Sequence, residues 1–409
     1  MTGATAVTAS GKKIWGLHPN VFFLGMVSLL TDVSSEMIFT LLPLFLANVL
    51  QVPMTIVGLV GGLSDSTEGI FKIFSGWFSD KIGKPKLLTV LGYGMATLVK
   101  PFMLVAASWG VVTGIRLGDR LGKGIRTSPR DALIADSVAA KERGRGFGLH
   151  RAMDTSGAFL GLAIAALIIY LTEGKALELT RVTYRSLVLV GIIPAVLAVL
   201  VLLIFVRERS KKTSPGGTSQ PSALPGVKVG FDARFKIFLA IMALFTLGNS
   251  SDFFVILRAQ NLQAPLVQVT LMLVLFNATY AAVSLPMGIL SDRLGRRRVI
   301  ALGWFIYALA YLGFALASSL WQIWVLFGLY GIYYGVVGGV TKAFVADMVG
   351  PGKRGTAYGF YNGLTAIILL PASLIAGWLW HSISPAATFY FGAGLAFMAM
   401  LGITIFIKE

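Results

Sequence analysis

Apolar runs of about twenty residues recur along almost the whole chain, with short polar connections between them. Each run is long enough to cross a hydrocarbon core of about 30 Å as a helix, and a helix satisfies its backbone polar groups internally. We count twelve such runs, at approximately residues 20–48, 55–79, 87–107, 109–136, 146–172, 184–206, 234–260, 264–290, 299–318, 320–347, 355–380 and 386–407. The pattern predicts an all-α membrane protein with twelve transmembrane helices.

Composition supports a membrane protein and argues against several other classes. Of the 409 residues, 56% are hydrophobic and 13% are charged, whereas a soluble domain carries about 25% charged residues. The chain has no cysteine, which excludes disulfides and thiolate metal sites, and we expect neither a metal centre nor a cofactor. The three histidines are scattered, and neither a phosphate-binding loop nor a nucleophile elbow is present, so we do not expect an enzyme.

The net charge of +17 is concentrated in alternate connections. The connections near residues 49–54, 107–109 and 318–320 have no basic residue, whereas clusters of lysine and arginine lie near residues 81–86, 141–145, 207–212, 293–298 and 353–354. This asymmetry is the positive-inside pattern, which predicts cytoplasmic termini and argues against a nucleic-acid partner. We expect a multi-pass protein of the bacterial inner (plasma) membrane whose partners are the lipid bilayer, protons and a small-molecule substrate.

The chain also divides into two similar halves. A polar segment rich in serine, proline and glycine separates the first six apolar runs from the last six. The sequence Gly-Trp-Phe-Ser-Asp-Lys-Ile-Gly-Lys, which begins at Gly76, recurs 212 residues later as Gly-Ile-Leu-Ser-Asp-Arg-Leu-Gly-Arg. Such internal repeats are typical of transporters. We predict an N-terminal bundle at residues 1–206, a cytoplasmic linker at 207–233 and a C-terminal bundle at 234–409.

The repeated sequence resembles the signature of the major facilitator superfamily, Gly-x-x-x-Asp-(Arg/Lys)-x-Gly-(Arg/Lys), which lies between helices 2 and 3 and again between helices 8 and 9. The segment that begins at Arg116 resembles the helix-4 motif of this family, Arg-x-x-Gln-Gly-x-Gly-x-Gly. It departs from the motif at Asp119 and Arg120, and Lys123 adds a charge between its glycines. The resemblance implies two pseudo-symmetric six-helix bundles that work by alternating access.

The resemblance also implies a cytoplasmic gate, in which the loop carboxylates pair with the opposite half when the transporter faces outward. The alternative is a solvated charged loop that only sets topology. Arg151 and Asp154, one turn apart, form a further structural or gating pair. The other residues assigned to the gate are Gly76, Asp80, Gly83, Lys84 and Asp136 in the first half, and Gly288, Asp292, Gly295, Arg296 and Asp347 in the second.

Ionisable residues inside the predicted spans are the strongest functional signal. Such a group costs at least about 2.5–3.5 kcal/mol near the bilayer centre, so it faces a bundle interior or a hydrated cavity. Helical spacing places Asp32 and Glu36 on one face. A partly dehydrated carboxyl group can load and release protons near neutral pH, and we assign proton coupling to these two residues. The alternative is that both are permanently ionised partners of Arg116 or Arg120.

A stripe of cations on helix 4 predicts an anion site, because guanidinium groups bind carboxylate and phosphate with matching geometry. The alternative is complete neutralisation of the stripe by the neighbouring carboxylates. The predicted substrate-binding residues are Arg116, Asp119, Arg120, Lys123, Asp65 and Glu68 in the first half, with Asn249, Asp252, Tyr280, Tyr358, Tyr361 and Asn362 in the second.

Two other features complete the sequence-based prediction. Lys100 on helix 3 lies apart from the other intramembrane charges, and we expect it to extend towards the outer interface. Glycines spaced four residues apart, such as Gly157 and Gly161, predict close helix packing within the bundle rather than between subunits, and we expect a monomer.

We therefore expect a proton-coupled secondary active transporter of a small polar, anionic solute, such as an organic carboxylate or a metal–carboxylate chelate. A proton-driven multidrug or cation exporter is the alternative, with Asp32 and Glu36 recognising cationic compounds. A membrane sensor or scaffold that has lost transport is the third possibility, and the intact signature loops in both halves speak against it.

Overall fold

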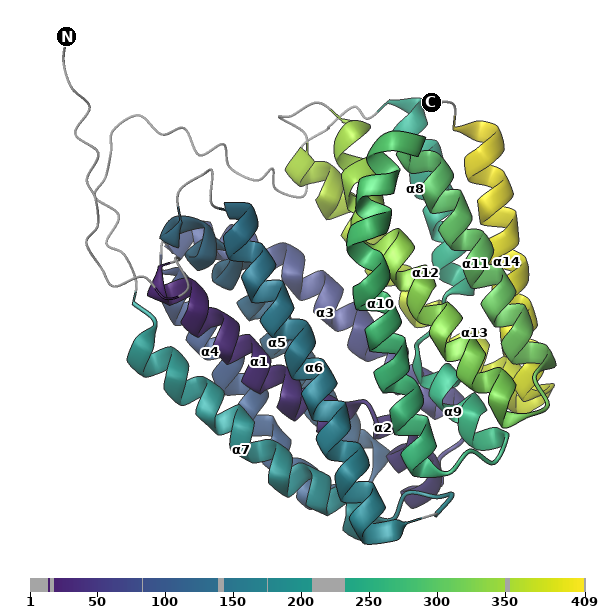
Figure 1. The fold of residues 1–409 in the computed structure, drawn as a ribbon, viewed down its shortest axis with the longest axis horizontal. Helices are drawn as coiled ribbons and strands as arrows, with labels where there is room; N and C mark the ends of the chain where they lie inside the picture. The colour runs from purple at the N-terminus through teal and green to yellow at the C-terminus, as the bar shows by residue number, and fades with distance from the viewer. Residues whose placement is uncertain are drawn as a thin grey trace.

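The computed structural model describes Ile14 and residues 18–82, 84–138, 143–174, 176–207, 232–349 and 354–407. This part of the chain is almost entirely helical and has no β-strand among its elements (Figure 1). The prediction of an all-α membrane protein is therefore confirmed.

The first half begins with a span made of α1 (Pro19–Phe39), the short α2 (Leu42–Leu44) and the π-helical turn η1 (Phe45–Val49). Pro43 lies at the point where the regular hydrogen bonding of this span is interrupted, as expected for a residue without an N–H. The remaining elements are α3 (Met54–Ile82), α4 (Pro85–Val99), the 3₁₀ turn η2 (Lys100–Leu104), α5 (Trp109–Ser137), α6 (Arg143–Glu173) and α7 (Arg181–Phe205).

The second half begins with a span that is broken in the middle. Its two parts, α8 (Ala233–Gly248) and α9 (Phe253–Asn261), are separated by four residues without helical structure, Asn249 to Asp252. The elements that follow are α10 (Leu266–Leu294), α11 (Arg296–Leu316), α12 (Leu320–Asp347), α13 (Arg354–Ser382) and α14 (Pro385–Phe406).

Length and composition qualify ten of these segments in the described chain as membrane-spanning helices. The two that do not qualify, α3 and α5, are each 29 residues long and carry the charges singled out above. Their length is sufficient to cross a bilayer, since 20 residues suffice at a rise of 1.5 Å per residue. Together the segments account for the twelve predicted spans.

Small residues allow close approach between helices within each half. A Cβ atom built at Gly161 on α6 would lie 2.6 Å from the Val33 carbonyl oxygen of α1. One built at Gly335 on α12 would lie 2.9 Å from the Tyr280 carbonyl oxygen of α10. Both glycines therefore serve packing inside a bundle.

The two halves meet at one end of the molecule. There the backbone N–H of Leu266 donates to the Ala176 carbonyl oxygen at 3.0 Å, and the Gln260 side chain donates to the Leu177 carbonyl oxygen at 3.1 Å. α3 packs along α13 of the opposite half, where a Cβ atom at Gly62 would lie 2.8 Å from the Ser373 Cβ. Figure 1 shows the halves diverging from this end towards the side where α1 begins and α14 ends.

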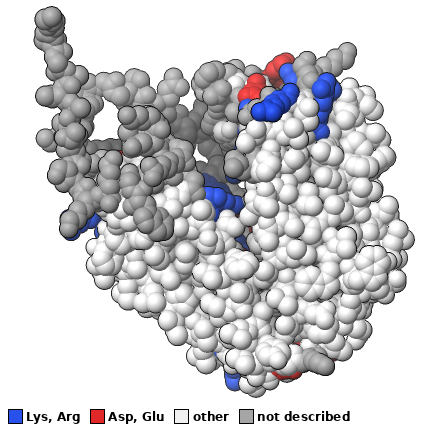
Figure 2. Space-filling model, in the orientation of Figure 1, with Lys and Arg blue, Asp and Glu red and all other residues white. Residues whose placement is uncertain are grey.

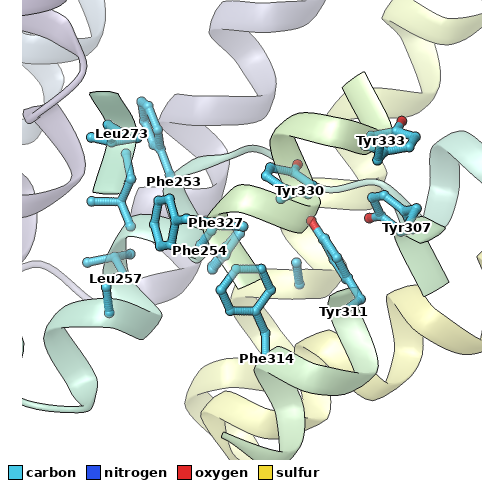
Figure 3. Packing of buried hydrophobic residues seen from close by; sticks show 14 of the residues in the cluster. Phe253, Phe254, Leu257, Leu273, Tyr307, Tyr311, Phe314, Phe327, Tyr330 and Tyr333 are labelled. Atoms are coloured by element: carbon cyan, nitrogen blue, oxygen red, sulfur yellow. The ribbon is translucent and has the colours of Figure 1, made fainter. Parts of the chain in front are cut away.

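The described residues form two hydrophobic clusters. The larger hydrophobic cluster contains residues of both halves, whereas a smaller cluster near the beginning of α1 contains only first-half residues such as Val21 and Leu202. In the second half, a dense group of rings forms the centre of the larger cluster, and Figure 3 shows Tyr307, Tyr311 and Tyr330 within it.

The prediction for Lys100 is wrong. Its side chain is fully buried and donates to the hydroxyl oxygens of Ser34 at 2.8 Å and Ser35 at 3.1 Å. Its ammonium group also lies 6.0 Å from the centre of the Phe39 ring. These acceptors on α1 give the charge polar partners inside the bundle, so it does not need to reach the membrane surface.

Candidate functional site

A cavity of about 350 Å³ lies between the two halves. Its wall is formed by α1, α3, α5 and α6 of the first half, and by the α8–α9 break, α9 and α10 of the second. Figure 2 shows a hollow between the halves with lysine or arginine side chains inside it. The cavity is therefore a polar space inside a protein whose outer surface in that view is mostly uncharged.

The wall of the cavity collects most of the intramembrane charges that the sequence singles out. Its basic residues are Arg116, Arg120, Lys123, Arg126 and Arg151, and its acidic residues are Asp32, Glu36, Asp65, Asp119, Asp154 and Asp252. Tyr280 also lines it. Helical spacing on α1 and α5 predicted shared faces, and the structure brings those faces to one space, together with Asp65 of α3.

The position of α5 explains why its charges face the cavity. A Cβ atom at Gly122 would lie 2.5 Å from the Gly92 carbonyl oxygen of α4, and one at Gly124 would lie 2.8 Å from the Phe71 Cβ of α3. The small residues therefore hold one side of α5 close to its neighbours. The charged residues, spaced three and four apart, lie on the remaining side.

Several of these charges are paired. Arg120 lies 2.6 Å from the Glu68 carboxylate, and the same carboxylate lies 3.5 Å from Lys123 and 3.9 Å from Lys72. Arg116 lies 3.4 Å from Asp119. Glu68 does not line the cavity itself, and its role is to hold the cations that do.

The arginines keep hydrogen-bond donors that no acceptor fills in the described part of the chain. These are the Nε groups of Arg116, Arg120 and Arg126, and one terminal nitrogen of Arg126. Arg116 and Arg126 are each only 4% exposed, and their guanidinium groups lie 4.5 Å from the Phe39 ring centre and 4.1 Å from the Tyr93 ring centre. A buried donor without a partner costs about 1–3 kcal/mol, and these nitrogens are themselves buried, although the three arginines line the cavity.

Two carboxyl groups from different helices form a second feature of the wall. The Asp32 side chain on α1 lies beside the Asp154 side chain on α6, and both line the cavity. Asp154 also accepts from the Ser28 hydroxyl at 2.6 Å and pairs with Arg151 at 3.1 Å. Two neighbouring carboxyl groups repel each other when both are ionised, so this pair is a candidate site for binding a proton.

This pairing differs from the predicted one. The sequence placed Asp32 with Glu36 because both lie on one face of a helix. In the structure both line the cavity, but Glu36 accepts a hydrogen bond from the Thr40 hydroxyl, whereas the neighbour of Asp32 is Asp154. The close approach of α6 to α1 at Gly157 and Gly161 brings Asp154 to this position, and no spacing within one helix could indicate it.

Among the described residues, the second half contributes a single charged side chain to the wall, that of Asp252. Asp252 lies in the break between α8 and α9 and accepts from the Tyr330 hydroxyl at 2.6 Å and the Tyr334 hydroxyl at 3.1 Å. Tyr280 on α10 accepts a hydrogen bond of 2.9 Å from Arg151 on α6, which links the two halves across the cavity.

Four residues predicted in the second half do not line this cavity: Asn249, Tyr358, Tyr361 and Asn362. The Tyr358 hydroxyl donates instead to the Lys342 carbonyl oxygen at 2.9 Å. The face of α13 that contains Asn362 lies against Gly69 of α3, which excludes it from the open space. For Asn362, this close packing of α3 on α13 is the reason for the difference.

The structure also adds residues that the sequence did not assign. Arg126, Ser251, Phe253 and Phe276 line the cavity. Arg126 continues the α5 stripe three residues after Lys123, so the spacing alone could have identified it. Phe276 lies one turn before Tyr280 on α10, but a phenylalanine in a membrane span carries no distinguishing signal.

The loop residues assigned to the gate are partly described. Arg296 pairs with Asp347 at 3.0 Å in the second half, whereas Lys84 and Asp136 are exposed. Gly295 has a φ of 90°, a conformation that favours glycine. Gly288 has open space where a Cβ atom would lie. Gly83 lies outside the described residues, as do the side-chain positions of Gly76, Asp80 and Asp292.

Metal binding receives no support from the described residues, among which no group of three or more histidine, aspartate or glutamate side chains could hold an ion. The absence of cysteine from the whole sequence removes the remaining common ligand.

Comparisons with known proteins agree with the fold. The model of the Major Facilitator Superfamily matches residues 24–257 and 237–409. An MFS-type transporter of Methanocaldococcus jannaschii is 39% identical over 394 residues, which cover 94% of each chain. The class B tetracycline resistance protein of Escherichia coli is 30% identical over 123 residues, or 30% of each chain.

Solved structures show the same architecture. The crystal structure of the nucleoside transporter NupG superposes with a TM-score of 0.73 at 14% identity, and the match covers 95% of this chain and 99% of that one. Two six-helix halves around a central polar cavity, together with the full-length family match, establish what this chain is. It belongs to the major facilitator superfamily and is a multi-pass membrane transporter.

Proposed function

We propose that this protein is a proton-coupled secondary transporter of a small anionic solute. The observation that carries the proposal is the row of guanidinium groups on α5, those of Arg116, Arg120 and Arg126, in the lining of the central cavity. Guanidinium groups bind carboxylate and phosphate with matching geometry, and charge-assisted hydrogen bonds of this kind are about twice as strong as neutral ones.

The transport cycle follows from how the halves meet. The contacts of Leu266 with Ala176 and of Gln260 with Leu177 close one side of the cavity. The opposite side lies where α1 begins and α14 ends, and the basic connections of the sequence assign that side to the cytoplasm. With that side in the cytoplasm, we infer an inward-facing state of an alternating-access transporter.

Proton coupling is assigned to Asp32 and Asp154, with Glu36 as a neighbouring acid on the same cavity wall. A proton shared by the first two would leave when the cavity faces the more alkaline side. The second carboxylate charge that then develops would alter the pairing of Asp154 with Arg151. Because Arg151 also binds Tyr280 of the other half, protonation would be linked to how the two halves contact each other.

Uptake into proteoliposomes with an imposed pH gradient tests the function. The purified full-length protein should accumulate at least one member of a panel of organic carboxylates, phosphate esters and metal–citrate complexes, and a protonophore should abolish the accumulation. Arg234→Ala, which removes an exposed cation at the start of α8, is the matched control for Arg120→Ala. If no anion in the panel accumulates in response to the pH gradient, the proposal is wrong.

A proton-driven cation exporter is the second candidate, and one observation favours it. Asp252 offers a carboxylate beside aromatic rings, which suits a cationic compound. The tetracycline resistance protein matches too little of the chain to add weight. Efflux of cationic dyes together with no response to any anion would support this candidate.

A further inference from the structure

The two walls of the cavity differ in charge. In the described chain, all five basic lining residues belong to α5 and α6 of the first half, where five carboxylates also line the cavity. The described second-half lining contains no basic residue and consists of Ser251, Asp252, Phe253, Ile256, Leu273, Phe276, Asn277 and Tyr280. A solute that spans the cavity therefore meets every lining cation on the first-half side and a carboxylate without a cation beside it on the second-half side.

Asp252 has no cationic partner within 4 Å in the described part of the chain. Its hydrogen-bond donors are the hydroxyl groups of Tyr330 and Tyr334, and the latter lies 3.1 Å from both carboxylate oxygens. Hydroxyl donors fix the position of a carboxylate without neutralising its charge. The residue is exposed, and it is exposed towards the cavity that it lines.

Aromatic rings surround this carboxylate. The ring of Phe276 lies 5.6 Å from that of Tyr330 and 5.3 Å from that of Tyr334, and Tyr334 lies 6.0 Å from Tyr280. Tyr330 is 2% exposed and its ring lies 5.9 Å from that of Tyr311 in the aromatic group that Figure 3 shows. The tyrosine that donates to the carboxylate is therefore held by packing in the core. Ring faces beside a carboxylate are the chemistry that binds ammonium groups.

The helix break fixes where this carboxylate lies. α8 ends at Gly248, and Asp252 is the N-cap residue of α9. Broken spans place helix ends at substrate and ion sites in other transporters. The carboxylate and the rings beside it favour a positively charged group of the ligand.

We propose that the transported solute is a zwitterion, with its ammonium group at Asp252 and its anionic group at the arginines of α5. The inference rests on the proposed function and narrows its substrate from anions in general to amino-acid-like or betaine-like compounds. A cavity of about 350 Å³ has room for a solute of this size.

Binding to matched pairs of compounds tests the inference. Each pair consists of a zwitterion and the carboxylate of the same shape that lacks the positive charge: glycine betaine with 3,3-dimethylbutyrate, γ-aminobutyrate with pentanoate, and common amino acids with their deaminated acids. For at least one pair, the purified full-length transporter should bind the zwitterion about tenfold tighter in calorimetric titration.

Asp252→Asn should reduce this preference to below about threefold while the carboxylate member still binds, because the amide keeps an acceptor for the tyrosines but carries no charge. Glu173→Gln makes the same chemical change at the end of α6, outside the cavity lining, and should leave the preference intact. Thermal unfolding of each variant checks that it is folded.

The other outcomes separate this inference from the proposed function. If carboxylates bind as tightly as their zwitterions, or if the preference survives Asp252→Asn, the zwitterion is ruled out, whereas a loss of carboxylate binding in Arg120→Ala would still support an anion transporter. If no member of any pair binds to the folded protein, the zwitterion inference fails, and uptake of phosphate esters and metal–citrate complexes into proteoliposomes then decides the proposed function.

Discussion

The first-half and second-half walls of the cavity hold their charged residues in different ways. In the first half, the Glu68 carboxylate forms ion pairs with three cations, and Asp32 lies beside Asp154. In the second half, one carboxylate on an aromatic surface is held by neutral hydroxyl groups. Ion pairs between neighbouring residues lower the free-energy cost of placing many charges in a membrane. An isolated charge is stable there only beside polar groups and a hydrated cavity.

This difference separates the roles of the two walls. A network in which one carboxylate serves several cations, as Glu68 does, can rearrange when a proton or an anion arrives. A single carboxylate between fixed rings has only one arrangement, so it suits recognition. We infer that coupling belongs to the first wall and that discrimination between solutes depends on the second.

The largest expected effect is on coupling. Asp32→Asn or Asp154→Asn should abolish accumulation driven by a pH gradient, because an amide cannot exchange the proton that the pair shares. Exchange of solute across the membrane at equal pH should persist in part. Tracer uptake and counterflow in the same proteoliposomes measure the two activities.

Glu36→Gln is the comparison for this first prediction. Glu36 lines the same cavity but has Thr40 as its hydrogen-bond partner. If accumulation remains intact in both aspartate variants, the carboxyl pair is not the coupling site. If only Glu36→Gln abolishes it, coupling belongs to Glu36.

The next largest effect is on stability. Glu68→Ala removes the carboxylate shared by Arg120, Lys123 and Lys72, and it leaves charges without compensation in the membrane. Removing one partner of a buried ion pair costs about 3–5 kcal/mol, so thermal unfolding in detergent should shift to clearly lower temperature. Asp252→Asn, in the second-half wall, should lower the unfolding temperature much less. Equal shifts in the two variants would contradict the difference between the walls.

A smaller effect is expected on anion affinity. Arg120→Ala should weaken binding of an anionic substrate by more than about tenfold, or 1.4 kcal/mol, because it removes a guanidinium donor from the cavity wall. Isothermal titration measures the change, and Arg234→Ala should leave the affinity as it is. An unchanged affinity in Arg120→Ala would count against an anion site on α5.

The smallest effect is expected from the hydrogen bond that joins the first-half and second-half walls. Tyr280→Phe removes the 2.9 Å hydrogen bond to Arg151 and keeps the ring. A single hydrogen bond contributes about 0.5–1.5 kcal/mol, so the balance between inward-facing and outward-facing states should shift only modestly. Because the chain has no cysteine, spin labels at introduced cysteines on α6 and α10 can report the distance between halves. No change in that distance distribution would show that this bond does not link the halves.

The sequence alone predicts the membrane spans, the two halves, the family and the cationic face of α5. Apolar length predicts the spans, since a bilayer has a nearly constant thickness. Repetition of the signature after Gly76 at Gly288 indicates the two halves and the family. Helical periodicity also places Arg116, Arg120 and Lys123 on one face, because the rise and turn of a helix are the same in every context.

Only the tertiary structure decided which faces meet. The pairing of Asp32 with Asp154, the contact of Asp252 with Tyr330, and the burial of Lys100 all join residues from different helices. Such contacts depend on the rotation and axial offset of one helix against another. Those two quantities result from the packing of many apolar side chains and glycines at once, and no local pattern encodes them.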